Sequence, residues 1–222
     1  MKGRACNPVP VSWRRRSGAP GLRVLAALLG LRAAWAQGDP SQGIDPEAGL
    51  PYWAWESPPV EIRLIQRLPD QTRGFFLARG FSSAAADRIA RSCIFQSIQR
   101  NRAGGADAPV LGVDLTQWRI LLADGQGSTA RSLALKEEWD REWVAAGESD
   151  RARVAFRWSL FPTRQTFRGG DYNWGMVSLG LPPGTHFDLR LAWTLDGEPQ
   201  EALLRGLICA PELLETEGQA PE

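Results

Sequence analysis

Apolar and polar residues alternate along several short stretches of the chain. Val60, Ile62 and Leu64 are apolar and the residues between them are charged, a period of two that is typical of a half-buried strand. Asp196 and Gly197 form a dipeptide that favours a tight hairpin between two such stretches. We therefore predict a protein built mainly of strands. The other stretches that we predict as strands are 113–120, 153–160, 174–179, 187–195 and 202–209.

Two segments have the three- and four-residue spacing of a helix instead. Over Ser83–Gln99 a serine can cap the first turn, three alanines follow, and an apolar stripe that includes Cys93 runs along one side. Over 133–146, Trp139 and Trp143 lie four residues apart. The fold class that we expect is an antiparallel immunoglobulin-like β-sandwich, with one packed N-terminal helix (about 83–99) and a short second helix (about 133–146).

Short strands between Gly- and Pro-containing turns also make residues 161–209 resemble secreted immunoglobulin-like modules. The resemblance implies a fold and no function, because one fold serves many functions. The Pro/Gly-rich N-terminal segment 37–58 is expected to be a linker. We expect the sandwich with its helix over 59–210 and an acidic tail over 211–222.

Residues 1–36 have the three parts of an export signal. Arginines occupy positions 14–16, an apolar stretch follows over 22–31, and Ala34-Trp35-Ala36 is a small-x-small cleavage site. The apolar stretch is too short for the roughly 30 Å of a bilayer core, so we expect no permanent membrane span. A cleaved signal would make the protein periplasmic or extracellular, and an uncleaved N-terminal anchor is the alternative.

Two of the three cysteines, Cys93 and Cys209, would remain after cleavage. An even pair in an oxidising compartment favours one disulfide, which would join the predicted helix to the last strand. The alternative is two separate buried thiols.

The charge of the chain is unevenly distributed. The formal net charge is +1, but seven of the 26 Lys and Arg residues precede residue 37, where no Asp or Glu occurs. The remaining 19 cations face 25 anions. This balance argues against nucleic acid as a partner, because phosphate binding requires a cationic surface.

Few residues offer reactive chemistry. The single histidine, His186, cannot form a zinc or copper site with only one methionine and two cysteines beyond residue 36, so we expect no metal, no cofactor and no catalytic residue. His186 follows a Pro-Pro-Gly turn, where an exposed histidine is the simpler interpretation. A carboxylate-dependent hydrolase stays open, with its densest acidic cluster in Glu137-Glu138-Trp139-Asp140.

Tryptophan is the distinctive residue of this sequence, with ten in the whole chain. Trp158 and Trp193 fall on the predicted inner faces of strands and are expected in the core. Two other groups are candidate partner or ligand surfaces, since aromatic and arginine side chains are common where proteins bind proteins or sugars. The candidates are Tyr52, Trp53, Trp55, Arg164, Arg168, Tyr172, Asn173 and Trp174.

Both candidate groups have a structural alternative. The first could fold back onto the sandwich, and the second could be a well-packed loop. The function that we expect is an exported non-enzymatic binding or assembly protein of a bacterial-type envelope, with another envelope or extracellular protein as its partner. A carbohydrate-binding module that takes a glycan is the alternative, and the carboxylate-dependent hydrolase is a further one.

Overall fold

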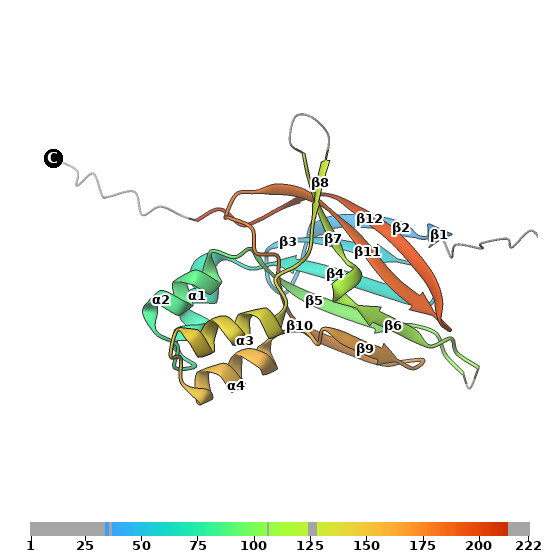
Figure 1. The fold of residues 1–222 in the computed structure, drawn as a ribbon. Helices are drawn as coiled ribbons and strands as arrows, with labels where there is room; N and C mark the ends of the chain where they lie inside the picture. Colours follow the sequence, from blue (N-terminus) through green and yellow to red (C-terminus); the bar gives the residue numbers. More distant parts are fainter. Residues whose placement is uncertain (1–33, 36, 106, 124–127, 213–222) are drawn as a thin grey trace, which may run out of the picture. The chain divides into compact units, whose positions relative to one another are not determined.

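The computed structural model describes residues 34–35, 37–105, 107–123 and 128–212. In this part of the chain two sheets face each other, one of five strands and one of seven, and four helices accompany them (Figure 1). The fold is mainly β and sandwich-like, as predicted. Its immunoglobulin-like character stays a prediction.

The five-stranded sheet is antiparallel throughout. Its strands, in spatial order, are β10 (Tyr172–Ser178), β5 (Ile94–Asn101), β4 (Val60–Gln66), β3 (Pro51–Glu56) and β2 (Asp39–Ile44). The segment 37–58, predicted as a linker, therefore contains two strands of a sheet. The many glycines and prolines of this segment led to the prediction of a linker, although Trp53 and Trp55 alternate in β3 and both point into the core.

The seven-stranded sheet is centred on a long hairpin, whose turn at Asp196 and Gly197 has positive φ at both residues, as predicted for this dipeptide. Its strands run in the order β1 (Ala34–Trp35), β12 (Glu198–Ile208), β11 (His186–Leu195), β6 (Leu111–Asp114) and β9 (Arg164–Phe167), with β7 (Arg119–Ala123) also on β11 and β8 (Ser128–Arg131) on β7. A short 3₁₀ turn, Leu115–Gln117, separates β6 from β7.

The helices form two hairpins, α1 (Pro69–Leu77) with α2 (Ser83–Ala90), and α3 (Lys136–Ala145) with α4 (Asp150–Ser159). They enclose a second apolar cluster, separate from the core between the sheets. The two hairpins meet through aromatic rings, with the centroid of Phe76 5.4 Å from that of Phe156 and Phe81 5.6 Å from Trp143. Figure 1 shows the hairpins side by side at one end of the sheets.

The helix predicted over Ser83–Gln99 is shorter than expected. Ser82 caps it by accepting a hydrogen bond from the backbone N–H of Ala85, but the helix ends at Ala90 and the chain continues as β5. The change of direction occurs at Cys93, whose φ of 54° lies in the left-handed region. Its place in an apolar helical stripe was therefore a wrong prediction.

The strand predicted over 153–160 is a helix. Ser149 accepts a hydrogen bond from the N–H of Ala152 and begins α4, which buries Ala152 and Phe156 four residues apart. Trp158, expected in the core, lies on the opposite side of this helix and is exposed. The apolar residues of this segment fit the spacing of a strand and also that of a helix. The helix forms because it lets Phe156 pack against the other helical hairpin.

An ion-pair cluster holds α3 to α4. Arg153 and Arg157 of α4 donate to the carboxylate of Asp140 in α3 at 3.1 to 3.3 Å. The hydrogen bond from Arg153, together with the charges of both arginines, holds the pKa of Asp140 below its ordinary value despite partial burial. These contacts occupy one acid of the cluster in which a hydrolytic pair was considered.

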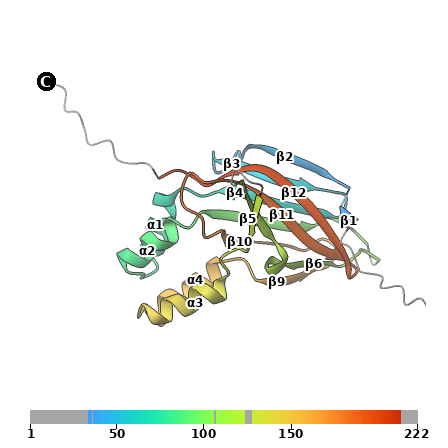
Figure 2. The same ribbon diagram turned by 45° about the horizontal axis from the view of Figure 1, so that its top comes forward.

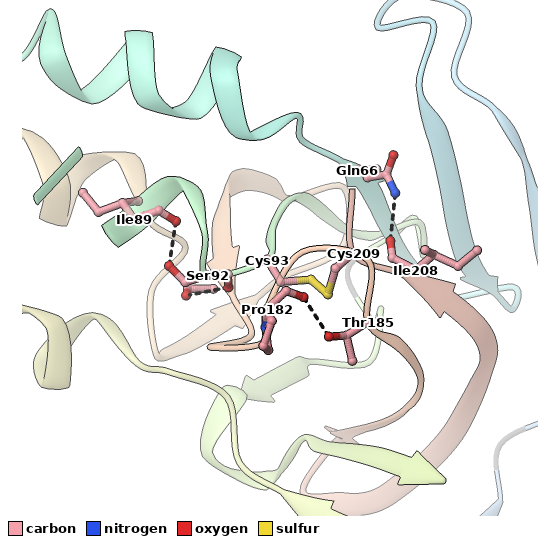
Figure 3. The surroundings of a disulfide bond; sticks show 9 residues. Gln66, Ile89, Ser92, Cys93, Pro182, Thr185, Ile208 and Cys209 are labelled. Atoms are coloured by element: carbon pink, nitrogen blue, oxygen red, sulfur yellow. Dashed lines mark hydrogen bonds between the residues drawn. A yellow bond between two sulfur atoms is a disulfide. The ribbon is translucent and has the colours of Figure 1, made fainter. Parts of the chain in front are cut away.

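The predicted disulfide between Cys93 and Cys209 is present, with sulfur atoms 1.98 Å apart and 116 residues of separation (Figure 3). Both cysteines are buried, and the bond joins the start of β5 to the residue that follows β12. It therefore connects the two sheets, whereas the sequence suggested a link between a helix and a strand. Gln66 strengthens this junction by donating to the carbonyl oxygen of Ile208 at 2.8 Å.

No helix among the described residues has the length and apolar character needed to cross a membrane. Of the predicted signal, 1–36, only Ala34 and Trp35 belong to the described residues, and they pair with β12 in parallel. The signal itself lies outside the described residues and stays a prediction, as does the tail beyond residue 212.

Candidate binding surface

Two large aromatic side chains stand exposed on β10. Tyr172 is 60% exposed and Trp174 is 63% exposed, on alternate residues of the strand and so on the same face of the five-stranded sheet. The residue between them points the other way: Asn173 donates to the Oε1 of Gln165 at 2.6 Å. β10 lies at the sheet edge, beside β9 and α4 (Figure 2).

The backbone beneath these rings is tightly constrained. A Cβ on Gly175 would lie 2.6 Å from the backbone nitrogen of Phe161, so only glycine lets the segment after α4 pass this close to β10. The N–H of Phe161 donates to the carbonyl oxygen of Met176 at 2.8 Å. The two exposed aromatic residues therefore stand on a fixed strand.

A third exposed aromatic side chain, Trp158, is 86% exposed at the end of α4. Leu160, two residues later, forms a backbone bridge with Met176, which lies two residues after Trp174. Trp158 and Trp174 therefore each lie two residues before a residue of the same backbone bridge. We call Trp158, Tyr172 and Trp174 the aromatic surface.

Arginine side chains lie on the same face of the five-stranded sheet as Tyr172 and Trp174. Arg100 of β5 is opposite Tyr172 in register, and its guanidinium carbon lies 5.4 Å from the centre of that ring. Arg63 of β4 stacks on Tyr52 at 4.2 Å and bonds the carboxylate of Asp45 at 3.3 Å. This face therefore combines aromatic rings with arginines, the residue types that are enriched at protein interfaces.

Trp53 and Trp55 do not belong to this surface. They are 7% and 6% exposed, and they point from β3 into the core between the sheets. Their rings contact Phe95 at 5.9 Å and Trp193 at 6.4 Å. Their prediction as a partner or ligand surface was wrong, and the alternative in which this segment folds back describes the structure. Tyr52, on the opposite side of β3, is half-buried beneath Arg63.

The two predicted arginines have different positions. Arg164 lies on β9 in the seven-stranded sheet and donates to Asp114 at 2.8 Å, which raises the pKa of the guanidinium. Burial raises the pKa of Asp114, but hydrogen bonds from Thr116 and Arg164 outweigh it and hold that pKa below its ordinary value. Arg168 is exposed in the turn before β10. Of the predicted set, the structure places Tyr172 and Trp174 on one exposed face of β10, and Trp158 at the end of α4 is a further exposed aromatic residue.

Trp158 was missed because its segment was predicted as a strand. The signal that identifies it is Ser149 as a helix cap, followed by Ala152 and Phe156 four residues apart. On a helix with that buried stripe, Trp158 falls on the solvent side.

The residues considered for catalysis do not converge. His186 is exposed at the start of β11. In α3, Glu137 accepts from the hydroxyl of Thr163, and Glu138 accepts from the N–H of Leu135 at 3.2 Å as a helix cap. Within the described ranges, no three His, Cys, Asp or Glu side chains group as metal ligands would.

Comparisons of the chain with protein-family models, with curated proteins and with solved structures give no match.

Proposed function

We propose that the chain is an exported, non-enzymatic binding or assembly protein of a bacterial-type envelope. Its partner would be another envelope or extracellular protein, bound through the aromatic surface. The observation that carries the proposal is the exposure of Trp158, Tyr172 and Trp174 on a rigid support, because large exposed aromatic groups mark interaction sites and act as binding hot spots.

Export is the second part of the proposal. The signal pattern of residues 1–36 supports it, and a buried disulfide suits an oxidising compartment better than the cytosol. The bond between Cys93 and Cys209 closes a long loop, which stabilises a domain that must persist outside the cell.

A glycan is the second candidate for the same surface. Tyr172 and Trp174 present their rings from alternate positions of one strand, a separation of about 7 Å, on which sugar rings could stack. Arg100 beside Tyr172 supplies hydrogen-bond donors for hydroxyl groups. We favour a protein partner because Trp158 extends the apolar contact area beyond the strand.

Recovery of partners from solubilised envelope tests the proposal. The tagged protein, its double variant Trp158→Ala/Trp174→Ala and the control Ile44→Ala would be compared by quantitative mass spectrometry. Ile44 is 64% exposed on β2, at the opposite edge of the same sheet, so its variant controls for loss of surface apolar area.

A partner recovered with the parent protein and with Ile44→Ala, but lost with the double variant, supports the proposal. Equal recovery by all three proteins contradicts it. Loss of retention on an immobilised glycan, in place of loss of a protein, selects the second candidate.

A further inference from the structure

A groove of about 370 Å³ crosses the outer face of the seven-stranded sheet, whereas the aromatic surface belongs to the five-stranded sheet and to α4. Two rows of residues that face each other across the strands form it. The first row is Thr166 of β9, Gly112 of β6, Thr194 of β11 and Pro199 of β12. The second row contains Arg164 of β9, Asp114 of β6, Ala192 of β11 and Glu201 of β12.

Small side chains on the two central strands create the depression. Gly112 and Ala192, which have the smallest side chains of the lining, lie on β6 and β11, while Arg164 and Glu201 lie on the flanking strands β9 and β12. The hydroxyl of Thr194 takes the space above Gly112, since a Cβ at that glycine would lie 2.6 Å from Thr194 Oγ1. Because residue 112 is a glycine, the hydroxyl group of Thr194 can lie over it and line the groove.

Polar side chains of the groove are free to bind a ligand. Among the described residues, the side chains of Thr166 and Thr194 lie on the groove face and make no hydrogen bond to the protein. Each can donate and accept. An apolar ligand would bury these groups without partners, at a cost of about 1–3 kcal/mol for each.

The charges in and beside the groove cancel in pairs. Arg164 bonds Asp114 at 2.8 Å, and Arg190 lies 3.9 Å from the carboxylate of Glu201. An anionic ligand would meet two carboxylates and a cationic ligand would compete with two arginines. The lining is otherwise mainly apolar, so the groove suits an uncharged ligand that combines apolar ring faces with hydroxyl groups. Its volume lies within the range of ligand sites, about 300–1,000 Å³.

We propose that this groove binds a neutral oligosaccharide, whose hydroxyl groups pair with Thr166, Thr194 and the flanking Arg164 and Glu201. This site is independent of the aromatic surface, from which it differs in sheet and in chemistry. The aromatic surface can bind its protein partner whether or not the groove holds a sugar.

Calorimetric titration of the full chain with cellohexaose, maltohexaose and chitohexaose, each at millimolar concentration, tests the proposal. We expect at least one of these probes to bind and to shift the backbone amide NMR signals of β6 and β11. Ala192→Phe, which fills the groove, should weaken that binding by about tenfold or more. Ala130→Phe, on an exposed position of β8 in the same sheet, should leave it unchanged.

A second variant guards against misfolding by the larger side chain. Thr166→Val/Thr194→Val removes hydrogen-bonding groups without adding volume, and it should also weaken binding while thermal unfolding stays unchanged. The proposal is overturned if no probe binds, or if neither variant weakens binding. It is also overturned if only Trp174→Ala abolishes binding, because the sugar would then lie on the aromatic surface.

Discussion

Removing the disulfide gives the most quantitative test of the fold. The bond between Cys93 and Cys209 spans 116 residues, so the chain-entropy relation assigns it about 4.8 kcal/mol of stability at 25 °C. For a domain of this size such a loss lowers the melting temperature by about 10–20 °C. The perturbation is the double variant Cys93→Ala/Cys209→Ala.

Denaturant unfolding monitored by tryptophan fluorescence measures the difference. The two single variants, Cys93→Ala and Cys209→Ala, provide the control. Each alone already removes the whole bond, so we expect both to lose nearly as much as the double variant. Losses that add up from single to double would indicate packing effects at two unlinked sites.

The result that refutes the reasoning is a small effect. If the double variant loses less than about 1 kcal/mol, the bond does not restrain the unfolded chain as the relation assumes. Reduction of the folded parent protein should also be slow, because both cysteines are buried and the reductant gains access only through opening of the structure.

Three further predictions follow from packing and charge. Gly175→Ala forces a Cβ against the Phe161 backbone and should destabilise by about 2 kcal/mol or more, whereas Gly74→Ala, in open space within α1, should stabilise by about 0.5–1 kcal/mol in the same unfolding assay. Trp143→Ala should cost about 3–5 kcal/mol, while Trp158→Ala should change stability by less than about 0.5 kcal/mol, which thermal unfolding can distinguish. Because the pKa of Asp140 is lowered in the folded state, its contribution is present above the unfolded pKa of about 3.9 and is lost as the pH falls through the lower folded value. Asp140→Asn should therefore cost about 0.5–1 kcal/mol at pH 7 and nothing in strong acid, as unfolding at each pH would show; a difference that is constant with pH would contradict this.

Secondary structure was predicted best in segments whose apolar residues follow only one repeat, either that of a strand or that of a helix. The alternation of β4 and of β11, and the Asp196–Gly197 turn, predicted strands and a hairpin that the structure confirms. The pairing of Cys93 with Cys209 also followed from composition and compartment, without knowledge of the fold.

Prediction failed in segments whose apolar residues fit both the two-residue repeat of a strand and the three- to four-residue repeat of a helix. The segment 153–160 alternates like a strand, but Ala152 and Phe156 also lie about one helical turn apart. Only the contact of Phe156 with the other helical hairpin decides between strand and helix. Along Ser83–Gln99 the helical stripe continued past Ala90, although β5 finds its place as an inner strand of a sheet. Long-range pairing of this kind is invisible to local pattern.

Only part of the candidate surface could be predicted, because local sequence does not show which strand faces are covered. Tyr172 and Trp174 stand out as aromatic residues near arginines, and the structure exposes both, whereas Met176 on the same face of β10 is buried in the helical cluster. Trp53 and Trp55 have the same local appearance, yet β3 places them between the sheets. Which face of a strand is covered depends on the second sheet, and one sequence segment does not contain that information.

Hydroxyl-radical footprinting tests the binding surface most directly. Oxidation of Trp158 and Trp174 would be compared between the purified protein and the protein in intact envelopes, with the buried Trp118 as an internal standard of low reactivity. The account predicts rapid oxidation of both exposed tryptophans in isolation and strong protection in the envelope. Equal oxidation of both in the two samples would contradict it, because the aromatic surface would then have no partner where the protein works.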